Sequence, residues 1–210
     1  TGTITATGQA ITITGTTTTE TGIYTTGAIN GGAVTLSSTQ STSTATLRTV
    51  YITGLITANS LTVNASGGAS STNVTLGAIT INVGGGNISV TANNAAAGAN
   101  TGIDQTGAIT NNAIGSSIGF TSNNKISQTG AIALVANTGT SAANITYDTT
   151  AGNNTSTITS AVPTIAAGST VAINYIVKTN GAIISVPAVT VPGYILLDNT
   201  CLGCATRTTP

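Results

Sequence analysis

The chain has 210 residues, of which 40% are hydrophobic but only 4% charged and 3% aromatic, and its formal net charge is zero. An average globular domain carries about 25% charged residues. The four lysines and arginines are too few and too scattered for the basic stripe that nucleic-acid binding requires. The chain contains no run of about 18 apolar residues, so the sequence predicts no membrane-spanning helix. The hydrophobic residues are mostly small or β-branched, which favours strands around a thin core.

Residues 1–60 are rich in threonine, and glycines separate short segments of alternating polarity, which predicts short strands. Thr-x-Thr pairs such as Thr3/Thr5 and Thr12/Thr14 resemble the motifs of ice-binding faces. Such a face needs the pairs to be stacked in register on a flat side. Because the pairs cluster near the N-terminus without a fixed period, the sequence favours ordinary outward-facing threonines of strands.

A heptapeptide that occurs twice is the most informative feature of the middle of the chain. Residues 103–109 return as residues 126–132, with six of seven residues identical and a separation of 23 residues. A fixed period of this size predicts a solenoid, in which each repeat buries its apolar side against its neighbours. The alternation of apolar and small polar residues predicts strands. We therefore expect Ile109 and Ile132 to occupy equivalent inward positions on successive coils.

Glycine and asparagine separate the strand-like segments of residues 61–160 and mark the expected corners between strands. The tripeptide Gly-Ala-Ile recurs at residues 27–29, 77–79, 107–109, 130–132 and 181–183. These spacings are not uniform, so the loops of the coils should differ in length.

Residues 161–210 differ from the rest because Pro163, Pro187 and Pro192 appear and the apolar runs lengthen. Proline belongs at strand edges and turns, and the open end of a solenoid needs covering. We predict an all-β fold, a β-solenoid of the parallel β-helix type with a C-terminal cap of longer strands. Residues 1–160 would form the β-solenoid repeat region, and residues 161–210 the C-terminal cap and cysteine-containing tail.

Catalysis is not predicted, because the chain has no histidine and its acids are far apart in the sequence: Glu20, Asp104, Asp148 and Asp198. We expect no enzymatic activity, no cofactor and no metal. A carbohydrate-active enzyme on a β-helix is the third hypothesis for the function, and it would require at least two carboxylates close together in a groove.

Cys201 and Cys204 are the only cysteines, and they admit three interpretations. A metal site would need more ligands, and a thioredoxin-like motif would need a βαβ unit around it. A local disulfide in an exported protein is favoured. Its stabilising effect should be modest, because the loop that it closes is short.

Six Asn-x-Ser/Thr sequons permit glycosylation wherever they lie at the surface of an exported protein. Their asparagines are Asn64, Asn73, Asn87, Asn144, Asn153 and Asn154.

Three segments of the chain, residues 86–93, 128–137 and 144–148, resemble the repeats of large bacterial exoproteins of the filamentous-haemagglutinin type. The resemblance covers roughly residues 60–160. It implies a right-handed parallel β-helix, export by two-partner secretion, and a role in adhesion or biofilm formation at the cell surface. Some members, the high-molecular-weight adhesins, keep a cysteine pair near the C-terminus that holds the fibre at its outer-membrane partner, and Cys201 and Cys204 are similar in placement.

The leading hypothesis is an extracellular, structural and adhesive protein without catalysis, part of a bacterial cell-surface fibre. Its expected partners are further copies of itself, an outer-membrane secretion partner, or a glycan of a host or other surface. The alternative is a self-assembling filament subunit, pilus-like or of a matrix fibre, joined by strand addition. Residues 1–14 are uncharged and contain no proline, so they would be a suitable donor strand.

Overall fold

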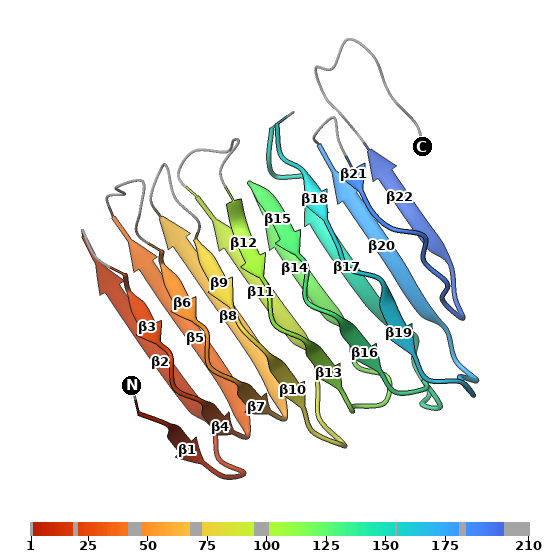
Figure 1. The fold of residues 1–210 in the computed structure, drawn as a ribbon, viewed down its shortest axis with the longest axis horizontal. Helices are drawn as coiled ribbons and strands as arrows, with labels where there is room; N and C mark the ends of the chain where they lie inside the picture. The colour runs from red at the N-terminus through yellow and green to blue at the C-terminus, as the bar shows by residue number, and fades with distance from the viewer. Residues whose placement is uncertain are drawn as a thin grey trace.

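The computed structural model describes residues 2–18, 21–41, 48–67, 73–94, 101–153, 155–180 and 184–199. These residues form twenty-two β-strands and no helix. The chain winds through three parallel sheets in turn and contributes one strand to each sheet per coil, so it is a β-solenoid with an elongated stack of coils (Figure 1). The predicted all-β solenoid is therefore confirmed.

Each sheet takes every third strand of the chain up to β21, after which β22 returns to sheet B, and neighbouring strands are hydrogen-bonded in parallel. Sheet A contains β1 (Ile4–Ala6), β4 (Ile29–Gly31), β7 (Ile56–Ala58), β10 (Ile79–Ile81), β13 (Ile109–Asn111), β16 (Ile132–Leu134) and β19 (Pro163–Ile165). Sheet B contains β2 (Ile11–Thr17), β5 (Ala33–Gln40), β8 (Ser60–Gly67), β11 (Ile88–Asn93), β14 (Ile118–Ser122), β17 (Ala143–Thr149), β20 (Ile173–Thr179) and β22 (Ile195–Asn199). Sheet C contains β3 (Ile23–Thr25), β6 (Val50–Ile52), β9 (Val74–Leu76), β12 (Thr101–Gln105), β15 (Lys125–Gln128), β18 (Ile158–Thr159) and β21 (Ile184–Ser185).

Columns of apolar side chains fill the interior between the three sheets. The first residue of six successive sheet A strands is isoleucine, and five of these side chains are buried: Ile29, Ile56, Ile79, Ile109 and Ile132. Ile109 pairs directly with Ile132, so the predicted equivalence of these two residues is confirmed. Burying each such side chain stabilises the fold by about 1.5–3 kcal/mol.

Glycine is required at the corner that leads from sheet C into sheet A, because successive coils approach each other closely there. A Cβ atom on Gly130 would collide with the carbonyl oxygen of Gly107, and a Cβ on Gly54 would collide with that of Gly27. This corner explains the Gly-Ala-Ile copies at residues 27–29, 77–79, 107–109 and 130–132: glycine lets the coils touch, and isoleucine then enters the interior. The copy at 181–183 lies outside the described residues.

The repeated heptapeptide spans this corner, and its shared residues have matching positions in both copies. Gln105 and Gln128 are fully buried, and Gln128 Nε2 donates a hydrogen bond of 3.1 Å to Gln105 Oε1. Each glutamine also donates to the carbonyl oxygen of the glycine two residues later. The two copies differ only where Asp104 pairs with Ser127, at a position between two buried ones that faces outward.

A column of aromatic side chains packs in the interior against the later strands of sheet B. The rings of Phe120 and Tyr147 stack with centroids 5.5 Å apart, and Tyr175 follows at 5.8 Å from Tyr147. The hydroxyl of Tyr147 donates a 2.9 Å hydrogen bond to Gln128 Oε1, which keeps this buried polar group satisfied. Burial raises the pKa of Tyr147 well above its ordinary value, and the neighbouring Tyr175 raises it further.

The three sheets continue beyond residue 160, where composition predicted a boundary. β19, β20 and β21 each pair in parallel with the strand of the preceding coil, and β22 pairs with β20. The C-terminal cap and cysteine-containing tail at residues 161–210 and the right-handed sense of the coil stay predictions.

Candidate contact surface

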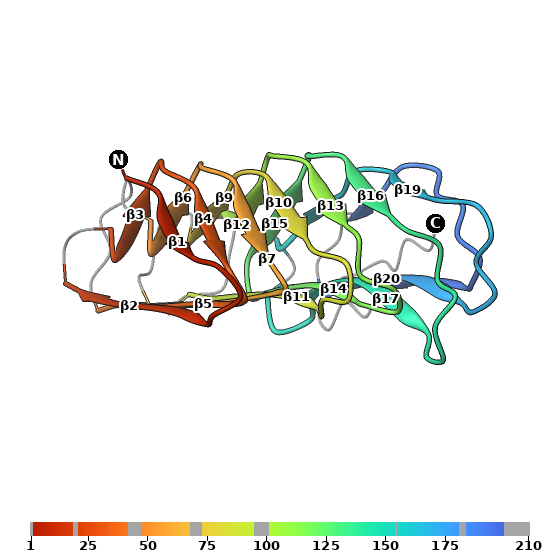
Figure 2. The same cartoon turned by 90° about the horizontal axis from the view of Figure 1, so that it is seen from below.

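The outer face of sheet B carries rows of hydroxyl and amide side chains in its first four strands. Residues of each strand alternate between the interior and the outside, and the outward ones pair across neighbouring strands. We call eight of these residues the hydroxyl face: Thr12, Thr14, Thr35, Ser37, Thr62, Asn64, Ser89 and Thr91. Sheet B lies as a flat layer along one side of the solenoid (Figure 2).

Two straight rows make up the hydroxyl face, because every pairing along them is in register. The first row follows the pairs Thr12–Thr35, Thr35–Thr62 and Thr62–Ser89, and the second runs parallel to it, two residues further along each strand. Neighbouring strands lie about 4.8 Å apart, and outward residues of one strand about 6.6 Å apart. The face is therefore a regular two-dimensional array of polar groups.

The polar groups of this array face solvent. Within the described part of the chain, no side chain of the hydroxyl face has a hydrogen-bond partner. In the adjacent third row, by contrast, the hydroxyls of Thr39 and Ser66 lie 3.2 Å apart and bond each other. All eight side chains of the hydroxyl face are exposed or half-buried, so water reaches them.

The same two rows change character in the last coils. The second row continues through Asp148, Lys178 and Asp198, which pair in register on β17, β20 and β22. The first row continues there through the apolar pair Ile176 and Leu196. An uncharged hydroxyl array thus gives way to a mixed charged and apolar surface along one continuous sheet.

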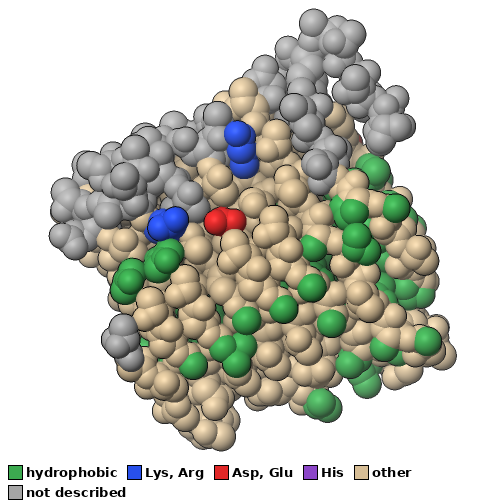
Figure 3. Space-filling view, viewed as in Figure 1, with side chains coloured by type: hydrophobic (Ala, Val, Ile, Leu, Met, Phe, Trp, Pro, Cys, Tyr) green, Lys and Arg blue, Asp and Glu red, His purple; other side chains and the backbone are tan. Residues whose placement is uncertain are grey.

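Sheet C carries a small aromatic and basic cluster on its outer side. The rings of Tyr24 and Tyr51 stack with centroids 5.2 Å apart, and the guanidinium of Arg48 lies 4.7 Å from the centre of the Tyr51 ring. Figure 3 shows few charged side chains among the described residues on this face of the molecule. Tyr24 and Tyr51 pair across β3 and β6, which makes them a cross-strand pair that stabilises the outer side of sheet C.

The structure separates most of the acids on which catalysis would depend. Asp104 lies on sheet C, whereas Asp148 and Asp198 lie on sheet B with the strand of Lys178 between them. Glu20 is outside the described residues. In the described ranges no three histidine, cysteine, aspartate or glutamate residues group into a candidate metal site. The absence of enzymatic activity stays a prediction.

The predicted glycosylation sites differ in accessibility. Asn64 and Asn87 are exposed, and Asn144 and Asn153 are half-buried. Asn73 is fully buried, and its Oδ1 atom lies 3.5 Å from the donating hydroxyl of Thr49, so the folded chain offers no acceptor amide there. Asn154 lies outside the described residues, as do Cys201 and Cys204. Glycosylation and the disulfide stay predictions.

Of residues 1–14, predicted as a donor strand, the described residues 2–14 belong to the first coil. β1 and β2 pair in register with β4 and β5 along one edge, and in the described part of this chain their other edge meets no strand.

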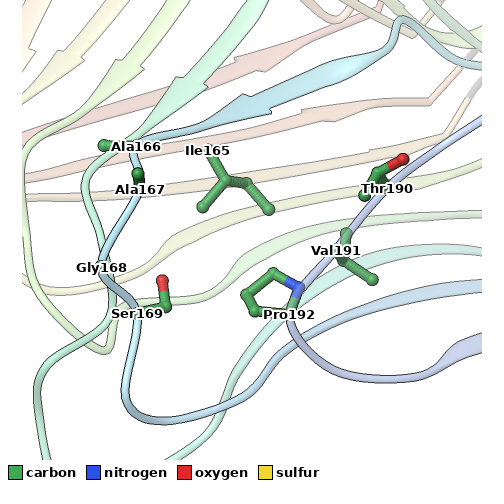
Figure 4. A pocket seen from close by; sticks show the side chains of 8 residues that line it. All are labelled: Ile165, Ala166, Ala167, Gly168, Ser169, Thr190, Val191 and Pro192. Atoms are coloured by element: carbon green, nitrogen blue, oxygen red, sulfur yellow. The ribbon is translucent and has the colours of Figure 1, made fainter.

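An open hollow of about 320 Å³ lies between the segments 165–169 and 190–192 (Figure 4). The side chains of Ile165, Val191 and Pro192 make it largely apolar, and Ser169 and Thr190 add one hydroxyl each. No charged residue lines it, so it offers no evident chemistry.

No family model, curated protein or solved structure matches this chain. Among the described residues there is no helix with the length and apolar character needed to cross a membrane.

The hydroxyl face is the functional candidate that sequence reasoning missed. Separations along its first row, continued to Thr146, are 23, 27, 27, 30 and 27 residues, so no constant period reveals it. Thr12 and Thr14 are outward-facing strand residues, as predicted, and they head the two rows, although the pair opposite them is Thr35 and Ser37 rather than a second Thr-x-Thr. The rows could have been found by aligning the apolar residues at which successive sheet B strands begin, because these residues stack and fix the register.

Proposed function

We propose that this chain is a segment of an extracellular β-solenoid fibre with a structural and adhesive role and without catalysis. The observation that carries the proposal is the hydroxyl face, where uncharged polar groups repeat from coil to coil along a scaffold that each added coil extends. Contact area on such a scaffold grows with the number of coils, and many weak contacts then add up to firm attachment.

The resemblance of residues 60–160 to filamentous-haemagglutinin-type exoproteins supports the same role. Under this proposal the chain is exported by two-partner secretion and meets an outer-membrane partner, and the coils beyond that partner contact other copies or a surface glycan. A disulfide between Cys201 and Cys204 would belong to the anchoring end. The low charge of the chain suits a surface whose contacts depend little on salt.

Antibodies against the folded chain test this proposal on cells of the source organism that have not been permeabilised. Immunogold electron microscopy should place the label on thin fibres at or beyond the cell surface. Label that appears only after permeabilisation would contradict the extracellular role.

Self-assembly into a filament by strand addition is the second candidate, favoured by the outer edge of β2, which pairs with no strand in the described part of the chain. Polymerisation of the chain, followed by light scattering, should be abolished when residues 1–14 are deleted. A full-length chain that stays strictly monomeric, or a deletion that assembles unchanged, would count against it.

A further inference from the structure

We propose that the hydroxyl face of sheet B binds ice. The inference rests on the proposed adhesive function and names the partner of one surface, a crystalline water lattice. It is argued from the register of the rows, their rigidity, their lack of charge and the free hydrogen-bonding capacity of their side chains.

Register gives the face a periodicity in two directions. Thr12, Thr35 and Thr62 pair directly across three strands, and the second row repeats this spacing beside them. Groups that recur about every 4.8 Å in one direction and about every 6.6 Å in the other make the most contacts at once with a partner that is itself periodic. Ice meets this condition, since its water molecules form a repeating array of hydrogen-bond donors and acceptors.

Rigidity lowers the entropic cost of binding such a lattice. Each strand from β5 to β11 is hydrogen-bonded on both sides, and the inward neighbours of these residues, such as Leu36, Leu61 and Val63, are fully buried. Threonine, the most frequent residue of the face, has a branched Cβ that restricts its χ1 angle. Its hydroxyl and methyl groups are therefore held in place before any partner arrives.

Charge and hydrogen bonding decide which periodic partner fits. The eight side chains of the hydroxyl face are uncharged, and the first charged residue of the rows is Asp148 on β17. A neutral array complements a neutral lattice and attracts no counter-ions. Because the hydroxyls of the face have no partner within the described part of the chain, each one can donate to and accept from lattice water. Every single contact is weak, and the rows add many of them together.

Ice-affinity partitioning of the full chain tests the proposal. Ice is grown slowly from a dilute solution, and the protein concentrations in the ice and in the remaining liquid are compared. The natural chain should be enriched in the ice fraction and should slow ice recrystallisation. Exclusion from the ice, as for a protein without affinity, would overturn the proposal.

Two matched variants locate the binding face. Thr62→Lys places a charge at the centre of the hydroxyl face, whereas Thr57→Lys places the same charge on the outer side of sheet A in the same coil. Both threonines are half-buried, and equal thermal midpoints would show that both variants fold. We expect Thr62→Lys to lose at least about tenfold of the ice enrichment and Thr57→Lys to keep it. Equal activity, or an equal loss, in the two variants would overturn the assignment to sheet B.

A third variant and a second solid complete the test. Thr62→Val removes the hydroxyl but keeps the branched shape, and it should lose enrichment even if Thr62→Lys fails to fold. Binding to microcrystalline cellulose without enrichment in ice would overturn ice as the partner. If antibodies label surface fibres but the chain is not enriched in ice, the ice-binding proposal fails and the adhesive role stands. The two proposals therefore fail separately.

Discussion

The inner and outer faces of sheet B belong to the same strands, but their side chains meet different physical requirements. On β8 the inward Leu61 and Val63 are fully buried, whereas the outward Thr62 and Asn64 reach solvent. The inner face needs side chains whose volumes fill the space between three sheets, while the outer face needs only register and small size. We infer that the inner face supplies most of the stability, and that the outer face is free to carry a contact function.

Truncating one inner and one outer residue of the same strand should separate the two faces most clearly. Leu61→Ala removes a fully buried side chain and should lower the free energy of unfolding by about 2–5 kcal/mol. Thr62→Ala, its outward neighbour, should change it by no more than about 0.5 kcal/mol. Urea denaturation measures both, and comparable losses in the two variants would break the comparison.

Replacing two glycines by alanine, one at the corner and one on the outer side, should give a smaller difference in the free energy of unfolding, again with the larger loss at the tightly packed position. Gly130→Ala places a Cβ against the backbone of Gly107 at the corner and should cost about 1–3 kcal/mol or more. Gly119→Ala adds a Cβ on the outer side of β14, where the nearest atom, the carbonyl oxygen of Ile88, is 3.9 Å away. This control should be neutral or stabilising by about 0.5 kcal/mol. Thermal unfolding in which Gly130→Ala melts with the natural chain would refute the close approach of the coils.

Raising the pH should destabilise the interior, which contains buried tyrosines, before it affects the outer rows. The raised pKa of Tyr147 means that the folded chain keeps this proton at a pH where the unfolded chain has released it. Stability should therefore be constant below about pH 10 and fall above it, by up to about 1.4 kcal/mol per pH unit for this group. Tyr147→Phe should reduce that slope without abolishing it, because burial also raises the pKa of Tyr175. An unchanged slope in urea titrations at several pH values would contradict this assignment.

The outer stack on sheet C should contribute least. Tyr24→Ala removes a ring that stacks on Tyr51 and should cost about 0.5–1.5 kcal/mol. Tyr194→Ala is the matched control, because Tyr194 is also exposed and has no ring contact among the described residues. A loss of several kcal/mol for Tyr24→Ala would mean that the outer side contributes more to folding than the comparison allows.

The sequence predicted the solenoid because the corner is chemically demanding. Glycine is needed where Gly107 and Gly130 meet, and buried Gln105 and Gln128 bond each other, while the one difference between the two copies falls at the outward Asp104 and Ser127 positions. Strict local requirements of this kind leave a repeat that is visible in the sequence.

The hydroxyl face could not be predicted in the same way, because nothing in the interior fixes the length of the loops. Between Thr62 and Ser89 the chain takes 27 residues, and between Ser89 and Gly119 it takes 30, while the register of the strands is kept. The outward positions also accept threonine, serine, asparagine or glycine, so no single residue marks the row. Stacking of the inner residues decides which outer residues become neighbours, and that stacking is a property of the three-dimensional fold.

The distance between two spin labels on the first outer row tests the in-register stacking most directly. Cysteines at Thr12 and Thr146 would carry the labels, with Cys201 and Cys204 replaced by serine. The two positions are five strand spacings apart in sheet B, so pulsed electron paramagnetic resonance should give a narrow distribution near 24 Å, about five times 4.8 Å. Moving the first label to Thr35 should shorten the distance by about 4.8 Å. A broad distribution, or a distance that does not change with this move, would contradict the stacking on which the hydroxyl face depends.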